Sequence, residues 1–115
     1  MNETTILQRI RLAASSIPGL RLFRQNVGML KDERGRMVRF GLHPGSADLI
    51  GWRTVTITPD MVGKQVAVFA SVEVKSPWGR VKPEQQNWLE QVTKAGGLAV
   101  VARSPEQAAE FFAKR

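Results

Sequence analysis

Three charged side chains stand inside segments that are otherwise apolar. Asp48 lies in Gly45-Ser-Ala-Asp-Leu-Ile-Gly51, and Glu73 and Lys75 lie in Val72-Glu-Val-Lys-Ser76. Because an unpaired carboxylate is costly to bury, two acids and a lysine in strand-like segments indicate a site that uses their charge. Carboxylate oxygens are hard ligands that select Mg²⁺ or Mn²⁺, so a divalent metal site is the chemistry that this pattern favours.

Lys75 completes the parts needed for phosphodiester hydrolysis. Strand alternation over residues 66–75 places Glu73 and Lys75 on one face, where the lysine could orient or deprotonate a water or stabilise charge on a phosphate. The backbone carbonyl of Val74 could add a metal ligand. Asp48 and Glu73 come from different predicted strands, and their carboxylates can converge on one cation if those strands are neighbours.

Each piece also has a structural interpretation. A lone Glu-x-Lys in a strand is typical of a solvated cross-strand charge ladder, and a lone aspartate after Gly45-Ser46 is typical of a turn or a cap. The presence of both Asp48 and Glu73-x-Lys75, followed by a basic turn and a helix, favours the metal site over these structural interpretations.

Helical spacing adds two polar residues to the set. Glu3 shares a stripe with Ile6 and Leu7, and Gln85 shares one with Trp88 and Leu89, so both are expected to point inward. The alternatives are a favourable charge at a helix N-terminus for Glu3 and a first-turn solvent contact for Gln85. The single histidine, His43, lies in a Gly/Pro loop where a phosphate contact or a structural hydrogen bond is favoured over zinc binding.

The periodicity predicts one α/β domain over residues 1–115, in the order helix, three strands, helix, strand, helix. A central mixed β-sheet flanked by helices is expected, with a right-handed parallel crossover over residues 66–102. The predicted segments are a helix over 3–16, strands over 20–23, 49–57 and 66–75, a helix from Pro83, a strand over 98–102 and a helix after Ser104. The charged, glycine-containing stretch 31–39 is expected to be a solvated, mobile loop.

Composition narrows the possible partners. The 115 residues include 17 Lys and Arg against 10 Asp and Glu, a formal charge of +7, which favours nucleic acid or an anionic membrane surface. No terminal helix combines a basic face with a large apolar face, so a membrane-surface function lacks support. There is no cysteine, no apolar stretch long enough to span a bilayer and no secretory signal, and we expect a cytoplasmic protein.

The ordered motifs resemble a known family. Glu3, Gly45-x-x-Asp48-Leu-Ile, Glu73-Val-Lys75, Pro83-Glu-Gln85-x-x-Trp88-Leu and Ala95-Gly-Gly97 together resemble the VRR-NUC family of the PD-(D/E)xK nuclease superfamily. The resemblance covers nearly the whole chain and is strongest to stand-alone, phage-type members, which would place the protein in the host cell cytoplasm. One departure is Ala47, which stands where the superfamily often has proline. Proline at that position restricts the backbone and does not bind the metal, so the departure does not remove a ligand.

The resemblance implies a restriction-endonuclease-like core and Mg²⁺- or Mn²⁺-dependent cleavage of DNA. It assigns metal binding to Asp48, Glu73 and the Val74 carbonyl, catalysis to Lys75, and supporting active-site roles to Gln85 and Glu3. Small members of this type resemble Holliday-junction resolvases, which are homodimers that act on branched DNA. A domain with one active site must pair to make symmetric double incisions.

DNA contacts are expected from polar residues near the acids and the lysine in the chain, with solvated surface charge as the alternative for each: Arg24, Asn26, Ser46, Arg80 and Lys82. Trp52 and Trp78 are candidates for a dimer interface, although core packing is the favoured use of both. The competing function is a catalytically inactive basic DNA-binding module of the same fold.

Overall fold

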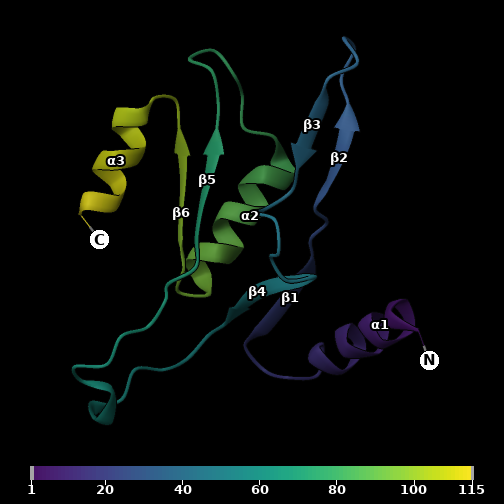
Figure 1. Cartoon of the computed structure of the whole chain (residues 1–115). Coiled ribbons are helices and arrows are strands. Elements are labelled where there is room, and N and C mark those ends of the chain that lie inside the picture. The colour runs from purple at the N-terminus through teal and green to yellow at the C-terminus, as the bar shows by residue number, and fades with distance from the viewer. Residues whose placement is uncertain (1, 115) are drawn as a thin grey trace. The chain divides into compact units, whose positions relative to one another are not determined.

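The computed structural model describes residues 2–114, and the chain divides into two compact units, Met1–Val55 and Thr56–Arg115. Each unit is described by itself below. The predicted α/β class is confirmed, since the described residues form three α-helices and six strands. Figure 1 shows these elements along the chain. The strands form three two-stranded ladders, β1 with β4, β2 with β3 and β5 with β6. A single domain over residues 1–115 stays a prediction.

The first unit begins with the predicted helix and an antiparallel strand pair. Helix α1 (Glu3–Ala14) is capped by the Asn2 side chain, which accepts a hydrogen bond from the Thr5 backbone N–H at 2.8 Å. Strand β1 (Leu20–Arg24) pairs with β4 (Leu49–Arg53). Gly51 is required in this pair, because a Cβ there would lie 1.7 Å from the Arg21 carbonyl oxygen. The pair ends beside residue 48.

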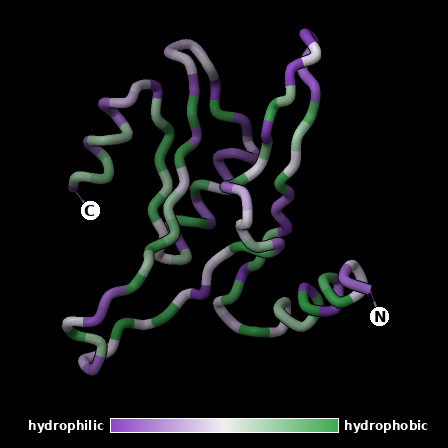
Figure 2. Tube along the Cα trace, viewed as in Figure 1, coloured by the Kyte–Doolittle hydropathy of each residue, from purple (hydrophilic) through white to green (hydrophobic). Residues whose placement is uncertain are grey.

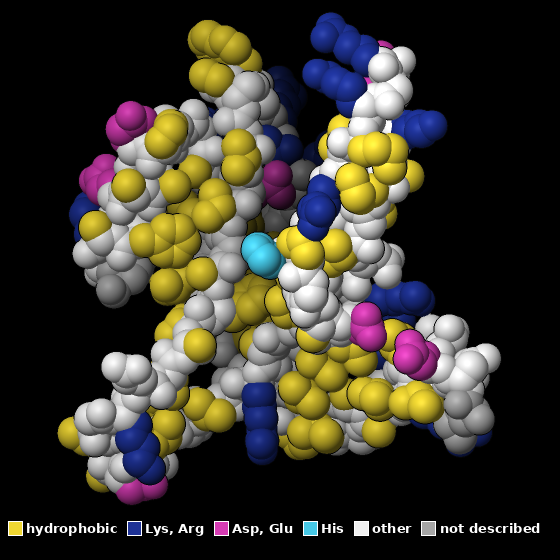
Figure 3. All heavy atoms as spheres, in the orientation of Figure 1, with side chains coloured by type: hydrophobic (Ala, Val, Ile, Leu, Met, Phe, Trp, Pro, Cys, Tyr) yellow, Lys and Arg dark blue, Asp and Glu magenta, His cyan; other side chains and the backbone are white. Residues whose placement is uncertain are grey.

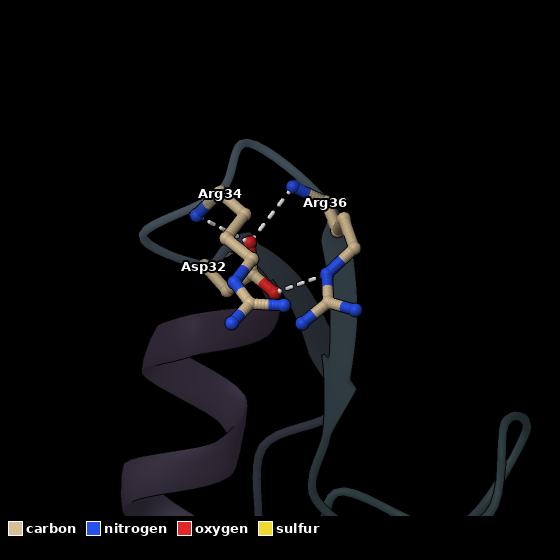
Figure 4. Close-up of polar contacts among 3 residues, drawn as sticks. All are labelled: Asp32, Arg34 and Arg36. Atoms are coloured by element: carbon tan, nitrogen blue, oxygen red, sulfur yellow. Dashed lines mark hydrogen bonds and ion pairs between the residues drawn. The ribbon is translucent and has the colours of Figure 1, made fainter.

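A β-hairpin occupies much of the stretch 31–39, so the expectation of a loop is wrong for its strand residues, whereas the expected solvent exposure is confirmed. Strands β2 (Gly28–Lys31) and β3 (Met37–Phe40) are antiparallel. The Asp32 carboxylate closes their turn by accepting hydrogen bonds from the Arg34 and Arg36 backbone N–H groups at 2.9 and 2.8 Å and from the Arg36 Nε at 2.8 Å (Figure 4). Bonds of this kind, from backbone N–H groups to an Asp side chain, stabilise a turn even when many of its other residues are charged.

Hydropathy explains why the hairpin was missed. Figure 2 shows hydrophilic residues at its tip, and Figure 3 shows Lys and Arg side chains gathered there. Apolar residues of its strands are themselves about half exposed, including Met29, Leu30 and Met37. The hairpin therefore lacks the alternation of buried and exposed residues on which sequence-based prediction of strands depends.

The second unit is built around a parallel strand pair. Strand β5 (Ala70–Val74) pairs with β6 (Leu98–Ala102), and α2 (Pro83–Lys94) connects them. Helix α3 (Pro105–Ala113) follows β6, and Figure 1 shows α2 and α3 on either side of the pair. Val92 of α2 and Ala102 of β6 are 1% and 3% exposed and form its small core. The strand-helix-strand unit over residues 66–102 is confirmed as a parallel crossover.

Most element boundaries follow their local signals. The 3-10 turn η1 (Pro59–Met61) lies where Thr58-Pro59 predicts a cap, and α2 begins at Pro83 as predicted. Ser104 caps α3 by accepting a hydrogen bond from the Gln107 backbone N–H at 3.1 Å. The Gln107 side chain accepts from the Arg103 N–H at 2.7 Å, one residue before the cap.

Two strands are shorter than predicted, because each ends with its partner. Strand β4 was expected to continue through Ile57 but ends at Arg53, and the Thr54 N–H makes the last bond to Gly19 at 2.8 Å. Strand β5 was expected from Val66 and begins at Ala70, opposite the first residue of β6. β-propensity alone does not extend a strand beyond the backbone groups with which it can pair.

We predict that the hairpin turn loses its carboxylate bonds only in acid. The Arg36 backbone N–H is the largest cause that holds the pKa of the Asp32 carboxyl below its ordinary value of 3.8, and the Arg36 side chain and Arg34 N–H add to it against partial burial. A lowered folded pKa means that the stabilisation is present above the unfolded pKa and is lost as pH falls through the folded one.

The NMR shifts of the Arg34 and Arg36 amide protons, followed against pH, check this prediction. Their midpoint is expected below 3.8, and Asp32→Asn should abolish the titration. A wild-type midpoint at or above 3.8 would contradict it.

Candidate active site

Glu73 of β5 and Lys75, the first residue after the strand, form an ion pair. Lys75 Nζ lies 3.9 Å from Glu73 Oε2, and the two side chains are 15% and 30% exposed. They stand two residues apart, so they share one face of the strand as predicted. At 3.9 Å this is a loose ion pair rather than a short charge-assisted hydrogen bond, and the carboxylate is left able to take another ligand.

Helix α2 packs on β6 and reaches β5 through Trp88. The Trp88 indole N–H donates to Ser71 Oγ at 3.1 Å, and the Trp88 ring meets the edge of Phe69 at a centroid distance of 6.3 Å. On the other face of β5, Val72 and Val74 are 41% and 74% exposed. The face of the strand that carries Ser71 is therefore the one that Trp88 of the helix contacts, and the valines lie on the other face.

Gln85 lies on the inward side of α2 and is half-buried, as its spacing predicts. It stands one helical turn before Trp88, and α2 runs back along β5, so it lies toward the end of the strand that carries Glu73. Its Oε1 accepts a hydrogen bond from the Lys82 N–H at 2.9 Å. Gln85 thereby closes the first turn of the helix, a role compatible with support of the site.

The Val74 carbonyl points away from the partner strand. In the parallel ladder, the Phe69 carbonyl accepts from Leu98 and the Lys75 N–H donates to Ala102, at 2.8 and 3.1 Å. Odd-numbered residues of β5 therefore direct their backbone groups to β6, and even-numbered residues direct theirs to the other edge. The Val74 carbonyl thus lies at the edge opposite β6, where a ligand can approach it.

Arg103 fixes the turn that follows Lys75, a role that sequence reasoning missed. Its guanidinium donates to the carbonyl oxygens of Ser76 and Gly79, both at 2.7 Å, and the Gly79 N–H bonds to the Ser76 carbonyl at 3.1 Å. A Cβ on Gly79 would lie 3.5 Å from Lys75 Cβ and Cδ, so the turn rests against the lysine stem. The acceptors are backbone carbonyls, which carry no sequence signal.

Asp48 precedes β4 in the first unit and is exposed. Its carbonyl accepts from the Gln25 N–H at 3.0 Å. The Gln25 side chain donates to Ser46 Oγ at 2.6 Å and to the Ala47 carbonyl at 3.2 Å, and accepts from the Leu42 N–H at 3.3 Å. Gln25 therefore holds the loop that carries Ser46 and Asp48, and it is a second positioning residue that no motif indicated.

The remaining predicted residues are exposed. Glu3 lies in the first turn of α1 and is exposed, so the expectation that it points inward is wrong. Ile6, on the same side of the helix, is also exposed, at 43%. The expected DNA contacts other than half-buried Ser46 are solvent-exposed: Arg24, Asn26, Arg80 and Lys82. His43 lies 3.0 Å from the Pro44 carbonyl through Nδ1, in keeping with a structural hydrogen bond.

The two tryptophans considered for an interface differ. Trp52 packs in the first unit with its ring 5.4 Å from Phe23. Trp78 is 92% exposed, so the expectation of core packing is wrong for this residue. It stands in the turn between β5 and α2 of the second unit.

The donor set on β5 fits a hard divalent cation. Within residues 2–114, no group of three or more His, Cys, Asp or Glu side chains is arranged to hold a metal. Magnesium in phosphate chemistry needs only one or two protein carboxylates, because waters and substrate oxygens complete its shell. The Glu73 carboxylate and the adjacent Val74 carbonyl supply such a partial set of oxygen ligands.

One hollow of about 570 Å³ lies elsewhere, in the first unit between α1 and β1. None of the predicted catalytic residues lines it, and its walls are Gln8, Arg11, Leu12, Ala14, Ser15, Leu20, Arg21 and Leu22. The chemistry predicted from the sequence therefore does not belong to this hollow. None of the helices in the described part of the chain is long and apolar enough to cross a membrane.

The second unit thus brings Glu73 and Lys75 within 3.9 Å of each other and has half-buried Gln85 in the first turn of α2. The VRR-NUC domain model matches residues 7–106, and the chain belongs to the VRR-NUC family. The match extends over both units and indicates a nuclease function. Comparison with curated proteins and with solved structures yields no match.

We predict a measurable coupling between Trp88 and Ser71 if α2 is held against β5 by their hydrogen bond. Trp88→Phe, Ser71→Ala and the double variant form a thermodynamic cycle, read by urea unfolding. The expected coupling free energy is about 0.5–1.5 kcal/mol, the net value of one hydrogen bond. Additive losses would contradict this packing. Thr93→Ala, on the same helix, is the control and should not couple to Ser71.

Proposed function

We propose that this protein is a Mg²⁺- or Mn²⁺-dependent deoxyribonuclease that hydrolyses phosphodiester bonds. The observation that carries the proposal is the partly buried ion pair of Glu73 and Lys75 at the end of β5, in a chain of the VRR-NUC family. An inactive basic module would gain nothing from a carboxylate that repels phosphate, so the pair favours catalysis over binding alone.

Glu73 and the Val74 carbonyl are proposed metal ligands from β5, and Asp48 is the proposed carboxylate ligand from the first unit. The oxygen chemistry of all three suits Mg²⁺ or Mn²⁺. When bound, the metal supplies Lewis-acid stabilisation of phosphate charge and a more acidic water. The assignment of Asp48 rests on the order of the family motifs along the chain.

Lys75 is the proposed catalytic cation. Its Nζ lies 3.9 Å from Glu73 Oε2, too far for a hydrogen bond, so its ammonium protons remain available to a phosphate oxygen or an attacking water. Its stem is covered by the turn at Gly79, which holds the head group in place. A fixed charge in a partly desolvated position stabilises developing negative charge more strongly than a mobile surface lysine does.

The other predicted residues have supporting roles in this proposal. Gln85 is proposed to orient a site group from the first turn of α2, and Glu3 to act as an accessory acid. Five polar residues are proposed to bind backbone phosphates without reading sequence: Arg24, Asn26, Ser46, Arg80 and Lys82. The net charge of +7 supports such a salt-dependent contact with DNA.

The finer proposal is a structure-specific endonuclease that acts as a homodimer on branched DNA such as Holliday junctions. It rests on the resemblance of the chain to stand-alone, phage-type members of the PD-(D/E)xK superfamily, and it entails a cytoplasmic location. Paired active sites explain symmetric incisions, since one small site cuts one strand at a time.

We predict metal-dependent cleavage that Glu73→Gln and Lys75→Ala abolish. Each removed catalytic group should lower the single-turnover rate by roughly 10²-fold or more, because its charge acts in the transition state. Cleavage of labelled branched and linear DNA is measured with Mg²⁺ and then with excess EDTA. Asp48→Ala should lose activity in the same way.

Charge-matched controls separate catalysis from general electrostatics. Glu106→Gln and Lys94→Ala make the same charge changes at exposed positions and should keep activity within about twofold. Metal-independent cleavage, or full activity in Asp48→Ala, would contradict the proposed mechanism. Salt-sensitive binding without any product would favour the inactive DNA-binding module.

The dimer proposal predicts paired nicks on a four-way junction. Solution mass should correspond to two chains, and cleavage mapping should place symmetric nicks on opposing strands. A monomeric mass with nicks on one strand only would contradict the dimer and leave the nuclease proposal intact.

A further inference from the structure

Trp78 is the most exposed large apolar side chain of the described residues, at 92%. A single exposed apolar residue is ordinary on a protein surface. Trp78 differs because its backbone is held firmly, whereas its indole is not covered. Figure 3 shows hydrophobic side chains projecting from the loop that joins β5 to α2.

The turn that carries Trp78 is fixed at both ends. Arg103 donates to the Ser76 and Gly79 carbonyl oxygens at 2.7 Å each, and the Gly79 N–H closes the turn onto Ser76 at 3.1 Å. Pro77, inside the turn, further limits the backbone. A preorganised side chain loses less conformational freedom on binding than a side chain in a mobile loop.

The turn also lies next to the proposed catalytic lysine. Ser76 follows Lys75 directly, and the Gly79 backbone rests against the Lys75 stem, as the 3.5 Å approach of an added Cβ shows. The turn that carries Trp78 is therefore next to the group proposed to act on phosphate.

Charge identifies the class of ligand. No acidic residue stands between Glu73 and Glu84, and the same stretch contains exposed Arg80 and Lys82. An aromatic ring beside basic residues is the combination that binds single-stranded nucleic acid, in which the bases stack on the ring and the cations follow the backbone. In an intact duplex the bases already stack on each other and their faces are closed to such a ring.

We infer that Trp78 stacks on an unpaired or unstacked DNA base beside the cleaved phosphate, so that the enzyme selects DNA with a gap, flap or branch point. The inference rests on the proposed nuclease function and deepens it by naming the feature of the substrate that the protein reads. Recognition of an exposed base face is tolerant of sequence, because every base has one.

Binding without cleavage tests the inference. Trp78→Ala, Trp78→Phe and wild type are titrated, with Ca²⁺ in place of Mg²⁺, into a duplex with a single-stranded gap that contains 2-aminopurine and into the fully paired duplex. Trp78→Ala should weaken gapped-DNA binding roughly 5- to 150-fold and change paired-duplex binding less than about twofold. Trp78→Phe should retain most of the affinity and of the 2-aminopurine quenching.

Val62→Ala is the matched control, because Val62 is 84% exposed but lies outside the turn, and its binding should not change. The thermal midpoint of Trp78→Ala should equal that of wild type, which excludes misfolding. An equal loss on both DNAs, or no loss, would overturn the inference. A dimer that becomes monomeric in Trp78→Ala would overturn it in favour of a second copy of the chain as the partner of Trp78.

The design keeps the two proposals separate. If wild type cleaves but Trp78→Ala binds gapped DNA normally, the stacking inference fails and the nuclease proposal stands. If Trp78→Ala loses gapped-DNA binding and wild type never cleaves, the nuclease proposal fails. Trp78 then stacks on a DNA base in a protein that binds DNA without cleaving it.

Discussion

The parallel pairing of β5 with β6 through α2 is the constraint on which the proposed chemistry depends. A parallel pair needs a long crossover, and here the crossover helix reaches the strand face that carries Ser71 and Glu73 through Trp88. That placement brings Gln85 toward the charged end of β5, whereas Val72 and Val74 are exposed on the other face of the strand. The carboxylate and the ammonium are thus partly removed from water while remaining 3.9 Å apart.

Backbone acceptors complete this arrangement. Arg103, directly after β6, donates to two carbonyl oxygens of the turn after β5, so the end of one strand holds the loop that leaves the other. Gln25 has the corresponding role in the first unit, where it holds the loop before Asp48. In each unit a long polar side chain binds backbone groups and positions a charged residue that it does not itself contact.

Local signals in the sequence were sufficient for the helices, for β6 and for the shared face of Glu73 and Lys75. Asn2, Pro83 and Ser104 mark helix starts through caps that act within one turn. The sequence was insufficient where pairing decides the structure. The ends of β4 and β5 depend on their partners, and the β2–β3 hairpin is held by Asp32 and not by an apolar face. The Asp32 and Gly35 spacing is the turn signal that could have indicated it.

The central claim is that Glu73 is a metal ligand beside Lys75, and manganese-induced broadening of NMR amide signals tests it most directly. We expect substoichiometric Mn²⁺ to broaden selectively the amide signals of residues 73–75 and of the residues around Asp48, and Glu73→Gln to remove the effect. Broadening confined to other acids such as Glu106 and Glu110, or unchanged in Glu73→Gln, would contradict it.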